Sequence, residues 1–425
     1  MRWHNALPAW QGARSTAFIL LCLAMLSFPF SVAVTNVFLG LALAVGMLSG
    51  WWWRGVIYCW HHYQWLLMAL LAYLIMLPLG LIWSLDVNWG VHILARHWFW
   101  LLLPVVVIVL EAESNRSTFL AVLSIGLIAN LIYCVLQANG LVEGHAAAGS
   151  SMNNPTGHIG HTSFGFIYGI WSAWLVHRGM QCRSRLAWLT WILALWAVVM
   201  VFMAQGQSGY IVTVSSFLLV AVKWAIAFRN RNVLLAGTLL LCLAGAVIVF
   251  GPGKDRIMGT WHALTQTDQQ DQLTIEGYAK SSAQSRLAWW SMSIDIWKQS
   301  PFYGVGTGGF PIAVKEWQAD PALQHGYRNI YSQVAIVHPH NQYLITLVRF
   351  GLVGLLVLVV FILIWIRTGL GRPWKNVESM PLIALSGMAL ALHGLDSTSF
   401  EEHFSSIFAL ILLGAGLSED EVKSP

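Results

Sequence analysis

Residues 341–365 have the sequence NQYLITLVRFGLVGLLVLVVFILIW, which is apolar apart from a polar start and Arg349. About 20 consecutive apolar residues in an α-helix cross a bilayer core. The stretch therefore predicts a membrane-spanning helix. It follows directly on the motif VHPH at 337–340, the most distinctive short sequence in the chain.

The composition of the whole chain also indicates a polytopic membrane protein. Of its 425 residues, 57% are hydrophobic and 10% charged, and the mean hydropathy is +0.64. Ordinary soluble domains carry about 25% charged residues, so a soluble enzyme and a disordered scaffold are excluded. The formal charge of +5 is too small and too scattered for a nucleic-acid-binding protein.

Apolar segments recur along the chain and predict an all-α protein with about twelve transmembrane helices. If the N-terminus is cytoplasmic, the short cytoplasmic loops hold most of the Lys and Arg, and the opposite short loops hold only Arg96. This bias predicts that both termini are cytoplasmic. The predicted segments are 16–33, 34–50, 64–83, 97–110, 117–137, 161–177, 187–205, 209–228, 232–250, 341–365, 381–395 and 404–418.

One long loop divides the chain into three parts. Residues 1–250 contain transmembrane helices 1–9, residues 251–340 form a non-cytoplasmic loop domain, and residues 341–425 contain helices 10–12. Structureless loops beyond about 15 residues are uncommon, so we expect the loop to be partly folded. Residues 281–299 predict an amphipathic helix that stops before Pro301, followed by the Gly-rich turn GVGTGG.

The VHPH motif is the first candidate for chemistry. Pro favours the first helical position, which makes His338 the expected N-cap and places His340 and Asn341 in the first turn. A helix N-terminus beside two imidazoles can bind an anion or supply a general base. A polar helix start with two interfacial histidines explains the same residues without a function.

Arg349 follows His338 by about three helical turns, so we expect it on the same face about 16 Å away. An arginine at that depth should face the bundle interior or a cavity. It is a candidate phosphate ligand, and the alternative is a structural partner for an internal carbonyl or carboxylate.

Two arginines of the long loop and one acidic residue complete the charged candidates. Arg286 opens the amphipathic helix, and its planar fork suits phosphate; a solvated charge is the alternative. Arg328 has a weaker claim as a cation. Asp396 lies in the acidic outer loop HGLDSTSFEEH at 393–403, where a carboxylate can orient or stabilise an imidazole.

A further polar segment, NNPTGHIGH at 153–161, precedes another apolar segment. His158 and His161 have a spacing that suits a metal, but no third ligand is nearby, so no metal site is predicted. His161 and Gln207 are candidates for contacts with sugar hydroxyls, and a capping loop is the alternative. No Walker motif or DxD pair suggests a nucleotide or another cofactor.

These motifs resemble the O-antigen ligase and polymerase superfamily, and within it the O-antigen ligases most closely. The resemblance covers most of the chain in topology, but its sharp motif spans only 285–351. The pattern is Ser285-Arg286 … Trp290 … Pro301 … Gly304-Val305-Gly306 … His338-x-His340-Asn341-x-x-Leu344 … Gly351.

The resemblance implies a GT-C-like, inverting, metal-independent glycosyltransferase in the inner membrane of a Gram-negative bacterium. Such enzymes work at the periplasmic face and transfer a finished glycan from undecaprenyl pyrophosphate to a sugar of the lipid A core. His338 would be the base on the acceptor hydroxyl, and Arg286 would contact the pyrophosphate. Asp396 loosely matches a family acid.

One departure from the family concerns charge. Many members have an arginine at the start of the eighth transmembrane helix, whereas this chain has AQGQSG at 204–209. Arg349 or Arg328 would have to supply that charge, with His340 and Asn341 as further donor contacts.

Three alternatives remain open. An O-antigen polymerase and a protein O-oligosaccharyltransferase use the same donor with a different acceptor. A transporter of lipid-linked glycans would bind the phosphates without chemistry; such proteins often show inverted repeats, which are not evident here.

Overall fold

The structure is a computed structural model. It describes residues 11–145, 149–181, 187–204, 206–228, 282–319, 336–372, 374 and 378–419. Within these ranges the chain is helical, and the only β-pairing is an isolated bridge between Ser151 and Asn154. The predicted all-α class is confirmed for this part of the chain.

The described part of the chain is a succession of helices. In order they are α1 (Gln11–Ser27), α2 (Val32–Leu48), α3 (Trp51–Leu79), α4 (Val87–Arg96), the 3₁₀ helix η2 (Trp98–Leu102), α5 (Leu103–Val109), α6 (Glu113–Ala138), α7 (His161–Gln181), α8 (Ala187–Met203), α9 (Gln207–Phe228), α13 (Ser282–Gln299), α14 (Phe310–Ala319), α16 (Gln342–Leu370), α17 (Met380–His393) and α18 (His403–Leu417).

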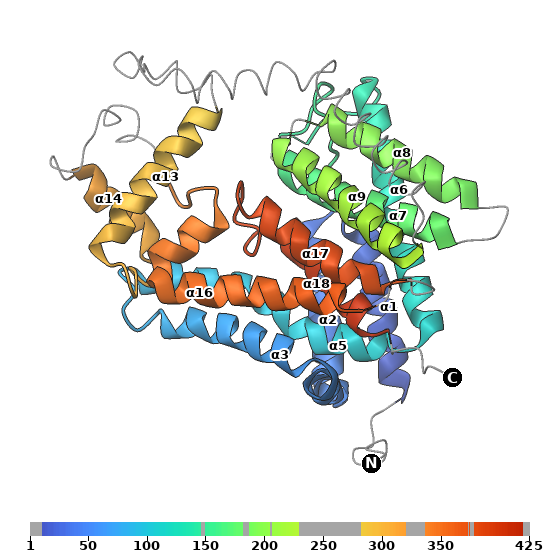
Figure 1. Cartoon of the computed structure of the whole chain (residues 1–425), viewed down its shortest axis with the longest axis horizontal. Coiled ribbons are helices and arrows are strands. Elements are labelled where there is room, and N and C mark those ends of the chain that lie inside the picture. The colour runs from blue at the N-terminus through green and yellow to red at the C-terminus, as the bar shows by residue number, and fades with distance from the viewer. Residues whose placement is uncertain are drawn as a thin grey trace.

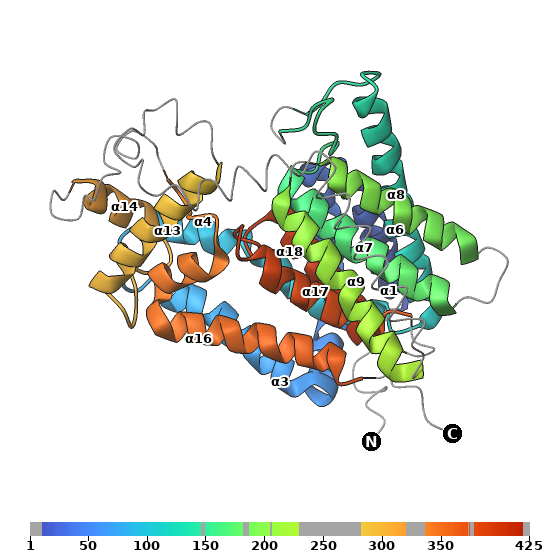
Figure 2. The same cartoon turned by 45° about the horizontal axis from the view of Figure 1, so that its top comes forward.

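The long helix α16 organises the molecule. It packs against α3 on one side and α17 on the other, and α17 packs against α18. Figure 1 shows α7, α8 and α9 at the far side of the molecule from α13 and α14. In the turned view, α13 and α14 gather at the N-terminal end of α16, which they contact (Figure 2). The predicted helix at 281–299 is confirmed by α13.

The helices include several that can cross a membrane. Five stretches are long and apolar enough: Trp51–Leu79, Val87–Val109, Glu113–Ala138, Ser208–Ile226 and Gln342–Leu370. The shorter apolar helices are Gly12–Ser27, Val32–Leu48, Ala187–Met203, Met380–His393 and His403–Leu417. These helices fit a multi-pass membrane protein, whereas the number twelve stays a prediction. The predicted segment 232–250 lies outside the described residues, as do residues 251–281 and 320–335 of the predicted loop domain.

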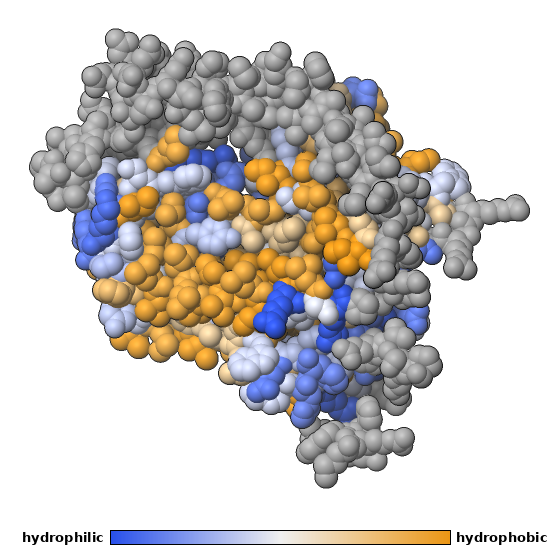
Figure 3. Space-filling view, viewed as in Figure 1, coloured by the Kyte–Doolittle hydropathy of each residue, from blue (hydrophilic) through white to orange (hydrophobic). Residues whose placement is uncertain are grey.

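The surface agrees with a membrane location. Figure 3 shows a broad apolar band across the face formed by α16 and α3, with hydrophilic patches at its edges. Exposed apolar side chains of α16 include Val353, Leu356 and Leu363, which are 52%, 64% and 59% exposed. Side chains this apolar are stable when exposed to lipid, but in water they would form an aggregation-prone patch.

The Gly-rich turn explains why α16 is broken near its start. At Gly351 the backbone leaves the helical region, with φ 63° and ψ −159°. The N–H groups of Val305 and Gly306 donate to the carbonyls of Val348 and Arg349, both at 2.9 Å. The turn therefore satisfies the carbonyls that the break leaves unpaired. Its spacing resembles a dinucleotide-binding motif, but here the glycines serve close packing against α16.

Replacing Gly351 by alanine should destabilise the protein by about 1–3 kcal/mol, because only glycine adopts this backbone conformation readily. The added Cβ would also lie 2.2 Å from the carbonyl carbon of Phe302. The check is the thermal unfolding midpoint of the purified protein. Gly40→Ala in α2 is the matched control, because no heavy atom lies within 4 Å of its added Cβ. Equal midpoints for both variants would contradict the expectation.

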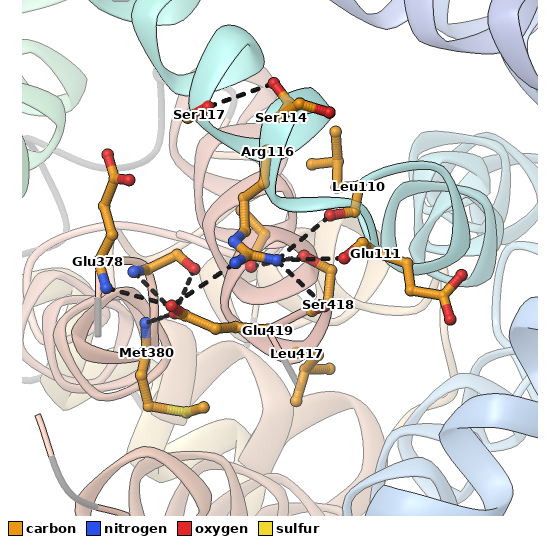
Figure 4. A network of polar contacts seen from close by, with 12 residues as sticks. Leu110, Glu111, Ser114, Arg116, Ser117, Glu378, Met380, Leu417, Ser418 and Glu419 are labelled. Atoms are coloured by element: carbon orange, nitrogen blue, oxygen red, sulfur yellow. Dashed lines mark hydrogen bonds and ion pairs between the residues drawn. The ribbon is translucent and has the colours of Figure 1, made fainter. Parts of the chain in front are cut away.

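A buried ion pair joins α6 to the segment that follows α18. Arg116 of α6 lies 3.6 Å from the carboxylate of Glu419, and both side chains are about nine-tenths buried. The same carboxylate accepts the N–H groups of Ser379 and Met380, at 2.9 and 2.8 Å (Figure 4). It thereby satisfies free N–H groups at the positive end of α17. The network fixes α6 and α17 relative to each other at the end of the bundle away from α13.

Candidate active site

The segment 337–341 is irregular, and this corrects the predicted helix start. The N-cap of α16 is Asn341, not His338: its Oδ1 accepts the N–H of Leu344 at 3.0 Å. His340 adopts a left-handed conformation with φ 51°, which a first-turn residue cannot have. The Asn341 side chain outcompetes Pro339 as the helix start signal because it caps a free N–H. The same amide donates to the carbonyl of Leu395 at 3.0 Å, so it also holds the loop after α17.

His340 is held between α13 and the loop it belongs to. Its ring stacks on Trp289, with the centroids 5.1 Å apart and the planes 20° apart. Burial, together with the neighbouring His338 and Arg286, lowers the pKa of His340 to about 3. The ring is therefore neutral at pH 7. Non-glycine residues in the left-handed region often mark functional sites.

Arg286 and Asp396 form an ion pair that ties α13 to the loop after α17. Their side chains are 21% and 19% exposed, and the Nη1 to Oδ1 distance is 2.6 Å. Burial raises the pKa of Asp396, whereas Arg286 lowers it. Beside this pair, the indole of Trp290 donates to the carbonyl of Pro339 at 3.1 Å. The predicted cation and the predicted acid are thus brought together, and both border the histidine segment.

Arg349 lies beneath the histidines with a carboxylate partner. Its guanidinium pairs with both carboxylate oxygens of Glu401, and the two side chains are 3% and 6% exposed. Arg349 therefore has the internal carboxylate that the alternative interpretation expected. The prediction of a continuous helix from His338 to Arg349 is wrong, because the chain before Asn341 is not helical.

His338 lies in the electrostatic field of this pair. Burial lowers the pKa of His338, with Glu401 opposing the shift and Arg349 and Arg96 adding to it. Its Nδ1 accepts the backbone N–H of His340 at 3.4 Å, a long bond. In the neutral ring, Nδ1 therefore carries the lone pair and Nε2 the proton. The imidazole is half-buried, neutral at pH 7 and has a weakly engaged basic nitrogen.

Three charged residues of this site were missed by the sequence interpretation. Glu401 and Glu402 stood in the acidic loop 393–403, from which only Asp396 was chosen. Burial raises the pKa of Glu401, but Arg349, His97 and His338 together outweigh it and hold the pKa below its ordinary value. Arg96, at the exposed end of α4, acts on His338. The available signal was that Arg96 is the only basic residue of the short outer loops.

Glu402 is surrounded by hydroxyl groups. Its carboxylate accepts hydrogen bonds from Ser397, from Ser163 of α7 at 3.3 Å, and from Ser405 of α18 at 3.3 Å. Burial raises the pKa of Glu402 to about 7, although the bonds from Ser163 and Ser405 oppose the rise. The residue links α7, α18 and the loop that carries Asp396.

This raised pKa predicts a pH-dependent stability. Between pH 4.5, which is the ordinary pKa of a Glu side chain, and about pH 7, the unfolded chain releases a proton that the folded chain keeps. Stability should therefore fall as pH rises through this window, by up to roughly 3 kcal/mol. Glu402→Gln should remove that part of the fall, measured as the difference in unfolding midpoint between pH 5 and pH 8. Glu316→Gln, on the exposed side of α14, is the control. An unchanged difference in Glu402→Gln would contradict the assignment.

The remaining predicted residues are placed as follows. His161 begins α7, and its charge acts on His340. Gln207 begins α9, but its side chain lies outside the described residues. The two helix starts meet, because a Cβ on Gly206 would lie 2.4 Å from the carbonyl oxygen of His161. Arg328 lies outside the described residues. Within the described part of the chain, no three His, Cys, Asp or Glu residues are grouped to hold a metal ion.

The fold and this site define a multi-pass membrane protein with a polar, charged centre at one end of an apolar helix bundle. Residues 192–359 match the family model described as O-Antigen ligase. The match supports membership of the O-antigen ligase superfamily. The match includes Arg286, His338 and Arg349, whereas the acidic loop 393–403 lies beyond it. No curated protein matches the chain.

Proposed function

We propose that the protein is an O-antigen ligase that transfers a glycan from undecaprenyl pyrophosphate to a sugar hydroxyl of the lipid A core. The observation that carries the proposal is a neutral imidazole, His338, within the field of Arg349 and Arg96, with Arg286 acting on the neighbouring His340. A base and several cations at one polar site suit a reaction whose donor is already activated.

The acceptor hydroxyl is activated by His338. Its Nδ1 has a lone pair whose present bond to the His340 N–H is long, at 3.4 Å, so an acceptor O–H can replace it. The hydroxyl oxygen attacks the anomeric carbon of the donor while its proton moves to Nδ1. The carbon–oxygen bond to the phosphate breaks, and its electron pair leaves on the diphosphate. Attack opposite the leaving group inverts the anomeric centre.

The leaving diphosphate is stabilised by the arginines. Guanidinium groups placed where charge develops lower the barrier without a metal ion or a proton. Arg286 and Arg349 are held in place by Asp396 and Glu401. Arg96 is exposed and has no ion pair among the described residues, so it is the best candidate for the cation that 204–209 lacks. His340 and Asn341 shape the loop that holds His338.

The location follows from the substrates. Both are anchored in lipid, so the site belongs at a membrane interface, where binding supplies much of the barrier reduction. The distribution of basic residues favours a periplasmic site in the bacterial inner membrane, with both termini cytoplasmic. The predicted loop domain, residues 251–340, would then cover the site from the periplasm.

The test is reconstitution of the purified full-length protein in liposomes with an undecaprenyl-pyrophosphate glycan. Three acceptors are offered in parallel: lipid A core, a second lipid-linked glycan, and a protein with accessible Ser and Thr. Transfer to lipid A core alone supports the ligase. Transfer to the second or third acceptor would instead identify a polymerase or a protein O-oligosaccharyltransferase. Movement of the donor across the bilayer without any transfer would identify a transporter.

A further inference from the structure

A second polar cavity lies at the other end of α16 from His338. It encloses about 610 Å³ between the end of α16 and the middle of α3. Arg367 is roughly 30–40 Å along the helix from Asn341, so the cavity is separate from the candidate active site. Its polar lining includes His62, Gln64, Arg367, Thr368 and Arg372.

The cavity has a positive charge that the lining does not neutralise. Two of its lining residues are arginines and none is acidic. Among the described residues, no carboxylate lies within ion-pair distance of Arg367, which is exposed. An anion is therefore the complementary ligand.

Arg372 is held in place before any ligand arrives. Its guanidinium donates to the hydroxyl of Tyr63 at 3.0 Å and lies 4.7 Å from the centroid of that ring. The Tyr63 hydroxyl in turn donates to the carbonyl of Leu417 at 3.0 Å. Tyr63 itself departs from helical geometry, with φ −141° and ψ 38°, so α3 is broken at the cavity.

One neighbouring neutral group adds a hydrogen-bond donor. The Thr368 hydroxyl donates to the carbonyl of Ile364 at 2.8 Å, and the Nδ1 of His62 pairs with the carbonyl of Tyr58 at 2.9 Å, so these two donors are already used. Gln64 is exposed, and its amide can donate to a ligand. A planar guanidinium fork suits the several acceptor oxygens of a phosphate.

Exposed tryptophans lie on the helix that lines the cavity. Trp65, one of its lining residues, is 71% exposed, and Trp60 and Trp53 are 45% and 58% exposed on the same helix. Exposed tryptophans favour the headgroup region of a bilayer. Leu363, four residues before Arg367 on α16, is 59% exposed. It adds an apolar surface for acyl chains. A ligand here meets cations at one end and an apolar surface at the other.

We propose that this cavity binds the phosphate of an anionic phospholipid headgroup. Arg367 and Arg372 neutralise the phosphate, the Gln64 amide donates to one of its oxygens, and the acyl chains lie along the apolar surface beside Trp65. The site lies on the face that the positive-inside bias predicts to be cytoplasmic, where basic pockets between helices bind lipid headgroups. The proposal does not depend on the proposed transfer activity.

The test is native mass spectrometry of the purified, delipidated full-length protein titrated with phosphatidylglycerol or phosphatidylcholine. We expect tighter binding of phosphatidylglycerol, and a loss of about tenfold in that affinity for Arg367→Ala. Arg367→Lys should keep part of the preference. Arg178→Ala is the matched control, because Arg178 is a partly exposed arginine that pairs with Glu378 elsewhere on the predicted cytoplasmic face.

Three outcomes would overturn the proposal. The first is equal affinity for the two lipids in the unchanged protein. The second is an equal loss in Arg178→Ala and Arg367→Ala when both variants keep the normal unfolding midpoint. The third is that inorganic phosphate displaces bound phosphatidylglycerol at the same concentration at which added lipid displaces it. That result would make the ligand a free anion.

Discussion

Replacing His338 by alanine should abolish glycan transfer, lowering the initial rate by about 10²–10⁴-fold, the usual contribution of a general base. The side chain is half-buried and its only described hydrogen bond is the long one to the His340 N–H, so its removal should leave the unfolding midpoint almost unchanged. The measurement is the initial rate of transfer in liposomes at saturating donor and acceptor, compared with the unfolding midpoint of the same preparation.

The pH profile of the unchanged protein provides an independent test of the same role. Burial holds the pKa of His338 below 6.5. The neutral, base-competent ring should therefore persist into mildly acidic solution, with the rate falling only as pH drops through a midpoint under 6.5. His92→Ala serves as the control, since His92 is exposed on α4. A near-normal rate for His338→Ala would remove His338 as the base.

Replacing Arg286 by alanine should weaken use of the donor by about 10–100-fold, the usual cost of removing a charged hydrogen-bond partner. The effect should be on the apparent affinity for the undecaprenyl-pyrophosphate glycan, with little change in the affinity for the acceptor. Lys298→Ala is the matched control on the same helix: Lys298 is 63% exposed and contacts only Asp295 among the described residues.

The ion pair with Asp396 raises a second explanation, which a charge exchange separates from the first. If Arg286 served only to hold α13 against the loop, the double variant Arg286→Asp with Asp396→Arg would restore the pair and the activity. If Arg286 binds the diphosphate, the exchange should fold normally and stay inactive. Full recovery of donor use in the exchange variant would therefore contradict the phosphate role.

The helical, membrane-embedded architecture could be predicted from the sequence because its signals are local. Apolar runs such as 341–365 specify helices without any partner, since a bilayer requires every backbone group to be bonded within its own segment. The amphipathic pattern at 281–299 likewise predicted α13, which the structure places at Ser282–Gln299. The motifs also indicated the superfamily whose family model matches residues 192–359, because they fall within those residues.

Local rules failed where two signals competed over a few residues. Pro339 favoured a helix starting at His338, but the Asn341 side chain caps α16 and the left-handed His340 separates the two. The Gly-rich turn was predicted, but its role was not. Its N–H groups bond the carbonyls next to the break at Gly351, some forty residues later in the chain.

The charge pairing of the candidate site was decided by tertiary structure alone. The sequence supplied Arg286, Arg349 and Asp396 as separate candidates, but which carboxylate each arginine meets depends on how α13, α16 and the loop after α17 pack. Arg286 meets Asp396, and Arg349 meets Glu401, a residue that no sequence pattern singled out. A helix depends on neighbours within four residues, whereas an ion pair depends on contacts between segments far apart in the chain.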